Sequence, residues 1–390
     1  MPNPARRLNN LPKYAFAIID ERLRTLQKQG ADIIRLDIGN PDLPPADFVV
    51  EALCKSAQQP GNHGYAGYSG TPTFRQAVAR YYHRRFGVVL DPDREVLPLI
   101  GSKEGLVNFS LAYLDAGDLA LVPDVGYPSY RMGATLAGAD VHLLPLRDEN
   151  EFLPDLDSIP DQVLRRAKIL WINYPNNPTG AIADEPFYEK ALTFCRVNNI
   201  LLASDNPYCD VTFEGYNAPS PLQIEGAKNQ TIEFISLSKT YNMAGWRVGA
   251  AVGSAEALSH LLTVKSNLDS GHFKPIYDAA ISALDQTDDA WLRSRNAIYQ
   301  ERRDLIMHAL PHIGLEARKP LGTLYIWAKV LRGNAQRYVE SALEDAHVSI
   351  APGTVYGEGG EGYVRLSTSV STLRILEAIE RLKVWYSKYG

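Results

Sequence analysis

The sequence predicts an α/β protein with two domains: a large domain with a mostly parallel sheet flanked by helices, and a smaller α/β domain formed by the N- and C-terminal parts. Three observations lead to this prediction. The chain has 390 residues, more than one hydrophobic core usually serves. Short apolar runs alternate with amphipathic helical stretches between about residues 95 and 255. Runs such as KILWIN are almost continuously apolar, which is typical of strands covered on both faces.

The elements follow in order along the chain. A helix is expected over 21–29, ended by Gly30, and IIRLDIGNPDLPP then reads as a strand and a turn. In the central region, strands are expected at 119–123, 168–173, 200–205, 232–238 and 248–252, with a helix over 186–198. A polar helix over 288–310 precedes the C-terminal strands in LGTLYIWAKV and YVRLSTS and a last helix over 371–389. We therefore expect an N-terminal arm and part of the small domain over 1–45, the large domain over 46–287, and a linking helix with the small C-terminal domain over 288–390.

Composition narrows the class of protein. The formal net charge is −5, which argues against a nucleic-acid surface and gives no reason to expect a membrane partner. The three cysteines, Cys54, Cys195 and Cys209, form no CxxC pair, so no metal site and no disulfide framework is expected. The apolar stretch near the N-terminus is short and carries Asp20 and Glu21, unlike a secretory signal. A reducing cytoplasm is the expected location.

The segment SLSKTYNMAGWRVG, residues 236–249, carries the most chemical information. Lys239 comes at the end of a strand-like run, where partial burial would favour the neutral amine that can attack an aldehyde. Ser236 and Ser238 offer hydroxyl groups beside it, and the fork of Arg247 suits a phosphate dianion. Because a lone lysine after a strand is usually a surface residue, the interpretation depends on further segments.

Four segments together resemble the class I/II aminotransferases, which are fold-type I enzymes dependent on pyridoxal 5′-phosphate (PLP). SLSKTYNMAGWRVG is similar to the family's cofactor-lysine signature, and NYPNNPTG (173–180) to its asparagine–proline loop. SDNPYCD (204–210) is similar to its aspartate–tyrosine segment, and YVRLS around Arg365 to its substrate-carboxylate arginine. The segments occur in family order, and the resemblance extends from LDIGNPD to the C-terminal helix.

The resemblance implies a role for each matching residue. Lys239 would hold the cofactor and then act as the general base, and Asp205 would keep the ring nitrogen protonated. Asn177 and Tyr208 would hydrogen-bond the phenolic oxygen of the cofactor, and the Asn177–Pro178 bond is expected to be cis. The phosphate would be held by the turn at Gly101, Ser102 and Lys103 together with Ser236, Ser238 and Arg247, and the ring would stack on Tyr127. Without the pattern, Asp205 would read as a helix cap, Asn177 as a turn residue and Tyr127 as a core or surface tyrosine.

Three further residues concern the substrate and a second subunit. Arg365 would clamp the substrate carboxylate with two hydrogen bonds, beside Asn177, and Gly39 would let the backbone approach that carboxylate. Tyr65, in HGYAGYSG, is similar to a tyrosine that reaches the phosphate of the neighbouring subunit. A homodimer with shared active sites is therefore expected.

The resemblance is greater to bacterial LL-diaminopimelate aminotransferases than to aspartate or aromatic enzymes. It implies transfer of an amino group from LL-2,6-diaminopimelate to 2-oxoglutarate, in lysine biosynthesis. The turn at residues 66–70, Ala-Gly-Tyr-Ser-Gly, lacks the acidic residue that some members have near the distal ammonium of the substrate. Another amino donor (aspartate, alanine or an aromatic amino acid) stays open, as does elimination or oxidation on the same fold. A PLP-sensing regulator is a remote alternative, because such proteins usually add a DNA-binding module.

Overall fold

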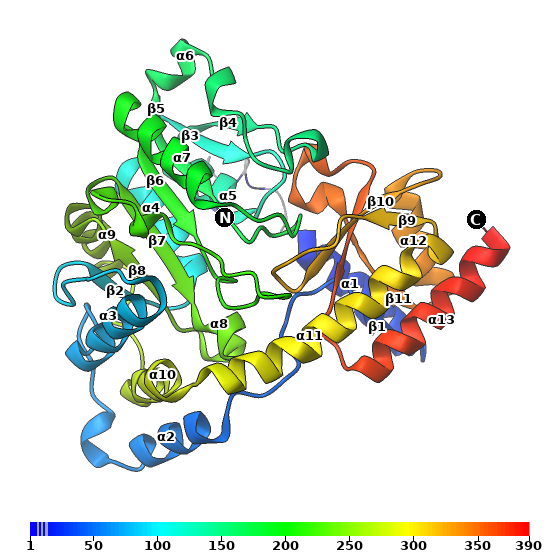
Figure 1. Ribbon diagram of the computed structural model, residues 1–390, viewed down its shortest axis with the longest axis horizontal. Coiled ribbons are helices and arrows are strands. Elements are labelled where there is room, and N and C mark those ends of the chain that lie inside the picture. Colours follow the sequence, from blue (N-terminus) through cyan, green and yellow to red (C-terminus); the bar gives the residue numbers. More distant parts are fainter. Residues whose placement is uncertain (6–7, 9–10, 12–14, 390) are drawn as a thin grey trace.

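Within the residues that the computed structural model describes (1–5, 8, 11 and 15–389), seven strands form one large sheet (Figure 1). The strands from β7 through β6, β5, β3 and β4 pair in parallel, whereas β8 is antiparallel to both of its neighbours, β7 and β2. In spatial order the strands are β2 (Val96–Leu99), β8 (Gly249–Gly253), β7 (Thr231–Ser236), β6 (Leu201–Asp205), β5 (Ala167–Ile172), β3 (Leu119–Pro123) and β4 (Asp140–Leu144).

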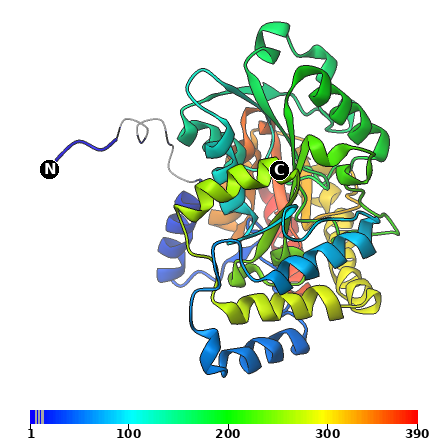
Figure 2. The same cartoon turned by 90° about the vertical axis from the view of Figure 1, so that its left-hand side faces the viewer.

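Helices cover both faces of the large sheet, as Figure 2 shows. Along β5, Ile169 and Trp171 belong to the core on one face, and Leu170 and Ile172 to the core on the other, as the two-residue period of a strand requires. The first face is covered by α4 (Ser102–Tyr113), α5 (Ser129–Ala137) and α9 (Ala255–Ser266). The second is covered by α2 (Asp47–Ala57), α3 (Pro72–Phe86), α6 (Asp161–Leu164), α7 (Glu185–Asn198) and α10 (Lys274–Gln286). Burial on both faces explains the continuous apolar runs in the sequence.

A second, antiparallel sheet lies in the C-terminal part of the chain, in the order β12 (Ala351–Pro352), β13 (Tyr363–Ser367), β10 (Tyr325–Val330) and β9 (Leu315–Ala317). Beside it, β1 (Ile34–Arg35) pairs in parallel with β11 (Val348–Ser349). Ile34 and Leu36 belong to the core that this sheet shares with α11, α12 and α13, so the N-terminal segment packs with the C-terminal part. The helices here are α1 (Ala15–Lys28), α11 (Asp289–Ala309), α12 (Ala335–Asp345) and α13 (Thr372–Tyr389).

The predicted fold class is confirmed, with two local differences. Helix α1 begins six residues before the expected start at 21, because Asp20 and Glu21 are tolerated within a helix. Strand β7 ends at Ser236, not 238: the Ser236 hydroxyl accepts a hydrogen bond from the Ser238 backbone N–H at 3.2 Å and caps the short helix α8 (Leu237–Thr240). The N-terminal strand β1 pairs with β11 of the C-terminal part, and the division into domains with limits at 45/46 and 287/288 stays a prediction.

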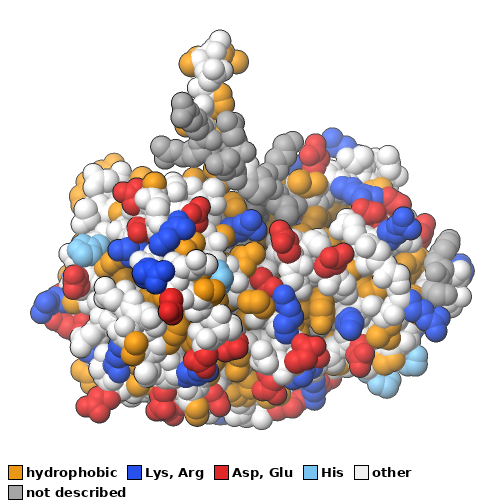
Figure 3. Space-filling view, turned by 90° about the horizontal axis from the view of Figure 1, so that it is seen from above, with side chains coloured by type: hydrophobic (Ala, Val, Ile, Leu, Met, Phe, Trp, Pro, Cys, Tyr) orange, Lys and Arg blue, Asp and Glu red, His pale blue; other side chains and the backbone are white. Residues whose placement is uncertain are grey.

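The surface carries both signs of charge. On the face seen in Figure 3, acidic and basic side chains are interspersed, without one dominant sign. None of the helices in the described part of the chain is long and apolar enough to cross a membrane.

Candidate active site

Chemically active side chains meet at one edge of the large sheet. The parallel strands β3, β5, β6 and β7 all end at this edge, which is where ligands bind in open α/β sheets. Gly249 at the start of β8 pairs with both Ser236 and Leu99, so the ends of β7 and β2 lie level with it. Segments far apart in the sequence are therefore brought to one place by the strand order.

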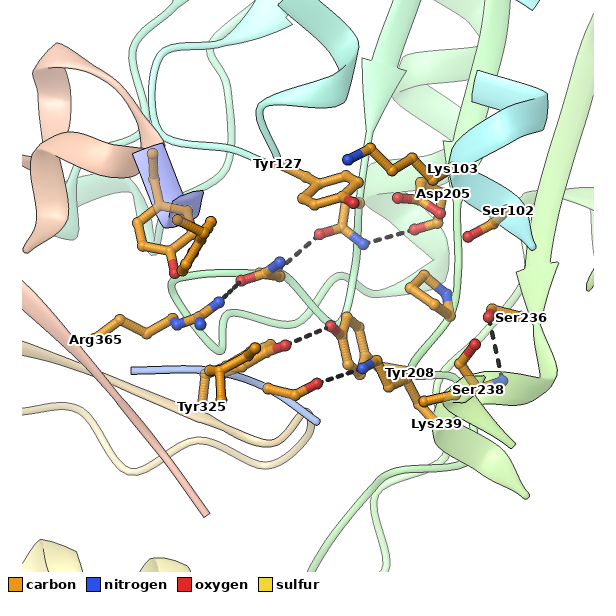
Figure 4. A pocket seen from close by; sticks show the side chains of 18 of the residues that line it. Ser102, Lys103, Tyr127, Asp205, Tyr208, Ser236, Ser238, Lys239, Tyr325 and Arg365 are labelled. Carbon is orange, nitrogen blue, oxygen red and sulfur yellow. Dashed lines mark hydrogen bonds between the residues drawn. The ribbon is translucent and has the colours of Figure 1, made fainter. Parts of the chain in front are cut away.

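A cavity of about 330 Å³ opens there, large enough for a small organic ligand (Figure 4). It is lined by twelve of the fourteen residues that the sequence analysis names as cofactor- or substrate-binding: Gly39, Ser102, Lys103, Tyr127, Asn177, Asp205, Tyr208, Ser236, Ser238, Lys239, Arg247 and Arg365. In Figure 4 the serines of α8 and β7 lie on the opposite side of the cavity from Arg365.

One side of the cavity combines a helix start with hydroxyl groups and a guanidinium. Helix α4 begins at Ser102, directly after Gly101, whose φ of 72° favours glycine. A Cβ atom at Gly101 would lie 2.2 Å from Nη2 of Arg247, so glycine is also what lets the guanidinium approach this turn. Nη1 of Arg247 lies 3.4 Å from the hydroxyl of Ser238. Backbone N–H groups at a helix start, hydroxyls and a guanidinium together form a site for a doubly charged oxyanion.

Lys239 lies on α8, directly after β7, and lines the cavity. Its Nζ donates a hydrogen bond to the backbone carbonyl of Gly39. Burial lowers the pKa of the Lys239 amine, and Arg365 and Arg247 lower it further, although Tyr325 opposes the shift. The amine is thereby closer to the neutral, nucleophilic form at physiological pH.

Asp205, the last residue of β6, presents a buried carboxylate to the cavity. Its Oδ2 accepts a hydrogen bond from the hydroxyl of Tyr130 at 2.7 Å, while Oδ1 is buried and has no hydrogen-bond partner among the described residues. Burial raises the pKa of Asp205 to about 7, against the opposing effect of the Tyr130 hydrogen bond. Asn173 fixes the backbone of this strand end, because its Nδ2 donates to the Asp205 carbonyl at 2.6 Å. A buried acceptor without a partner is costly unless a ligand supplies a donor.

Arg365, from β13, lies on the opposite side of the cavity. Its Nη1 donates to Oδ1 of Asn177 at 2.8 Å and its Nη2 to the carbonyl of Asp37 at 2.6 Å. Its Nε is buried and has no hydrogen-bond partner in the part of the chain that the structure describes. The Asn177–Pro178 peptide bond is cis, as predicted, and so is Tyr174–Pro175.

Tyr325 of β10 joins these groups, although the sequence analysis gives it no role. Its hydroxyl lies 2.9 Å from that of Tyr208, and the Arg365 guanidinium carbon lies 3.9 Å from the centre of its ring. Burial alone would raise the pKa of Tyr325, but the positive charges of Arg365 and Lys239 outweigh it and lower the pKa. A Cβ at Gly39 would lie 1.9 Å from the Tyr325 hydroxyl, so Gly39 is required by the packing of this ring.

Of the two remaining predicted residues, Gly101 forms the turn before α4, and Tyr65 lies outside the cavity and is 90% exposed. Eight residues line the cavity without having been predicted: Phe16, Asp20, Ile38, Asn173, Pro207, Ala244, Tyr325 and Tyr356. Asn173, Pro207 and Ala244 lie inside the segments that carry the family resemblance, so position along the chain could have found them. Phe16, Asp20 and Tyr356 come from the N-terminal helix and the C-terminal part, and no local pattern marks them.

Known proteins resemble the chain over nearly all of its length. The family model for aminotransferase class I and II matches residues 31–382. LL-diaminopimelate aminotransferase of Moorella thermoacetica is 47% identical over 380 residues, which are 97% of each chain. The enzyme of the same name from Desulforudis audaxviator is 48% identical, again over 97% of each chain.

Solved structures agree with this assignment. The apo structure of BacF from Bacillus subtilis superposes with a TM-score of 0.95 at 36% identity, over 100% of both chains. A probable N-succinyldiaminopimelate aminotransferase from Thermus thermophilus gives a TM-score of 0.90 at 40% identity, over 95% of this chain and 99% of the other. The chain therefore belongs to the class I and II aminotransferases, and it is a PLP-dependent transaminase.

Proposed function

We propose that the cavity holds PLP in the orientation implied by the chemistry of its lining. The phosphate would be held at the start of α4 by backbone N–H groups, with Ser236, Ser238 and Arg247 around it. Among the described lining residues, this group of donors is the one best suited to bind a dianion. Tyr127 would lie against the ring, and Asn177 and Tyr208 would donate to the phenolic oxygen.

Asp205 shows whether the chemistry of the cavity suits PLP. The buried Oδ1 of this residue lacks a partner in the described chain, and a protonated ring nitrogen would supply the missing donor. This contact would also offset the cost of burying a charged carboxylate, which the raised pKa reflects. The unpartnered acceptor is the observation that carries the cofactor orientation.

Bound PLP supplies an electron sink that makes the Cα–H bond of an amino acid acidic. The residues of the chain do the rest. Arg365, which lines the cavity and has a buried Nε without a partner among the described residues, would bind the substrate carboxylate, and Tyr325 and Tyr356 would form the wall that limits access of water. Lys239, once its amine is free, takes the Cα proton, and its lowered pKa keeps the amine available as a base at neutral pH.

The amino donor that is best supported is LL-2,6-diaminopimelate, with 2-oxoglutarate as acceptor, a reaction of lysine biosynthesis. The support is identity of 47% with an LL-diaminopimelate aminotransferase over 97% of both chains. It adds to the resemblance of residues 204–220, 233–253 and 264–273 to such enzymes, although residues 66–70 lack the acidic residue that some of them use.

An amino-donor panel tests this proposal. With 2-oxoglutarate as acceptor, we expect kcat/KM for LL-2,6-diaminopimelate to exceed that for aspartate, alanine, arginine and aromatic amino acids by at least about 10²-fold. Single half-reactions, followed by the visible absorbance of the bound cofactor, separate recognition of the donor from recognition of the acceptor. A donor of another class that reacts as fast would overturn the assignment.

We also propose a homodimer in which Tyr65 completes the cavity of the neighbouring subunit. This proposal is supported by the exposure of large side chains in the single chain. Tyr65 is 90% exposed and so packs against little of its own chain, and Tyr68 (55%), Leu268 (62%) and Phe273 (41%) are exposed as well. Partner contact would bury such side chains.

Hybrid dimers test the shared site. Neither Tyr65→Ala nor Lys239→Ala homodimers should be fully active. A hybrid of one Tyr65→Ala subunit and one Lys239→Ala subunit contains one site with both residues intact, so about half of the wild-type activity per dimer should return. A hybrid no more active than its parents would show that Tyr65 acts within its own subunit.

The expected compartment is the cytoplasm. The three cysteines are free in the structure, and Cys195 and Cys209 are buried, which suits a reducing environment.

A further inference from the structure

We propose that Asp20, on helix α1, binds the distal ammonium group of the amino donor and thereby selects a diamino acid. This inference rests on the proposed function and adds the residue that reads the far end of the substrate. The turn at residues 66–70 contains no acid, so recognition of that positive charge has to come from another element.

Helix α1 presents one face to the substrate side of the cavity. Phe16 and Asp20 are four residues apart, hence on the same face of the helix, and both line the cavity. The Phe16 ring lies 6.1 Å from the ring of Tyr356, and the guanidinium carbon of Arg365 lies 5.8 Å from the centre of the Phe16 ring. Asp20 is therefore one helical turn from Phe16, whose ring lies beside the Arg365 guanidinium that would hold the substrate carboxylate. In Figure 4, Arg365 lies on the opposite side of the cavity from Ser236 and Ser238.

Of the two carboxylates among the described lining residues, Asp20 is the one that the proposed cofactor orientation does not use. Among the described lining residues, the cations are Lys103, Lys239, Arg247 and Arg365, and the carboxylates are Asp20 and Asp205. Asp205 faces the ring nitrogen in the proposed orientation. Asp20 is then the one carboxylate of the described lining that is available to a cationic substrate group.

Arg35 holds the Asp20 carboxylate but does not neutralise the site. Nη1 of Arg35 lies 2.8 Å from Oδ1 of Asp20, whereas its Nε and Nη2 donate to the two carboxylate oxygens of Asp37 at 3.1 and 2.7 Å. One guanidinium thus serves two carboxylates, and the group of three keeps a net charge of −1.

The geometry of the carboxylate leaves acceptor capacity. Oδ1 of Asp20 is buried and is held by the ion pair with Nη1 of Arg35 at 2.8 Å. The side chain as a whole is 34% exposed, so its accessible surface belongs to its other atoms. A carboxylate that is fixed on one side and accessible on the other can accept a charge-assisted hydrogen bond from an ammonium group. Such a hydrogen bond is about twice as strong as one between neutral groups.

Two amino-donor substrates that differ only in the distal amine isolate the contact between Asp20 and the distal ammonium group. LL-2,6-Diaminopimelate and L-2-aminopimelate share the carbon chain and both carboxylates, and only the first has the second ammonium. For Asp20→Asn we expect kcat/KM with the diamino donor to fall about 10- to 100-fold, mainly through KM, because one charge-assisted hydrogen bond is lost. With L-2-aminopimelate the value should change less than about 3-fold or rise, because a repulsion with the distal carboxylate is removed.

Three control measurements show whether a loss is specific. Glu21→Gln changes the same charge at the next, exposed position of α1 and should leave both donors unchanged. Asp20→Glu should restore part of the preference for the diamino donor. Unfolding temperature and the visible absorbance of the bound cofactor should match the wild type in every variant, which excludes a loss caused by misfolding.

The outcomes separate this inference from the proposed function. If the wild type does not prefer the diamino donor over L-2-aminopimelate, the proposed donor and the role of Asp20 both fail. If the wild type has the preference and Asp20→Asn keeps it, only the role of Asp20 fails. An equal loss with both donors would mean that Asp20 supports α1 and does not read the substrate, which also overturns the inference.

Discussion

Replacement of Lys239 by alanine is expected to lower kcat by about 10³-fold or more, because both the group that attaches the cofactor and the general base are lost. The visible absorbance of the lysine-bound cofactor should disappear in the same variant. The fold should persist, since the buried amine contributes one hydrogen bond to the Gly39 carbonyl, and burial already disfavours its charged form. Steady-state rates, absorbance spectra and thermal unfolding measure the three expectations separately.

Two comparisons make this result specific. Lys190→Ala removes a lysine whose side chain is 52% exposed and pairs with Asp157 on the surface, so it should retain wild-type kinetics. A small primary amine such as methylamine, added to Lys239→Ala, should restore part of the rate, because it supplies the missing base in solution. Near-wild-type turnover by the alanine variant would mean that another residue carries the proton, and the mechanism would have to be abandoned.

The central part of the fold follows from local sequence, because its signals are strong and repeated. The sequence predicts strand β3 with its observed bounds, since a buried parallel strand is continuously apolar, and helix α7 to within one residue. The predicted end of β7 is wrong by two residues, because Leu237 continues the apolar pattern although Ser236 already caps the next helix. Short-range capping of this kind overrides hydrophobicity at element boundaries.

The site is predictable where strand ends supply it. Asp205 and Ser236 end β6 and β7, and parallel pairing alone brings them to one edge. Tyr325 cannot be found in this way, because it reaches Tyr208 only when the antiparallel sheet packs against the large one. Asp20 depends on the packing of α1 across the same cavity, which is a tertiary event without a signature in the local sequence.

Asp205→Asn is expected to lower kcat by at least about 10²-fold and to weaken cofactor binding. An amide in this place cannot stabilise a protonated ring nitrogen as a carboxylate does, although its oxygen can still accept the hydrogen bond from Tyr130. Rates at saturating cofactor, together with a cofactor titration, separate the effect on chemistry from the effect on affinity. Asp157→Asn, in which a side chain with 76% exposure changes in the same way, is the matched control.

The same substitution should change how the stability of the apoprotein depends on pH. The pKa of Asp205 is raised from 3.8 to about 7 by burial, so the folded apoprotein binds this proton more tightly than the unfolded chain. The stabilisation linked to this proton is complete below about pH 4 and is lost as the pH rises through about 7, with a total of at most about 4 kcal/mol. Asp205→Asn removes the titrating group, and the free energy of unfolding should then vary less between about pH 4 and pH 8.

Urea unfolding of the cofactor-free protein across this range gives the measurement. Wild-type apoprotein should lose stability as the pH rises, Asp205→Asn should show a flatter profile, and Asp157→Asn should follow the wild type. Added PLP should stabilise the wild type most at the upper end of the range, because the ring nitrogen then supplies the proton that the charged carboxylate lacks. If the profiles of wild type and Asp205→Asn coincide without cofactor, burial does not destabilise the charged carboxylate, and its unpartnered oxygen carries no energetic cost that a bound ring nitrogen would relieve.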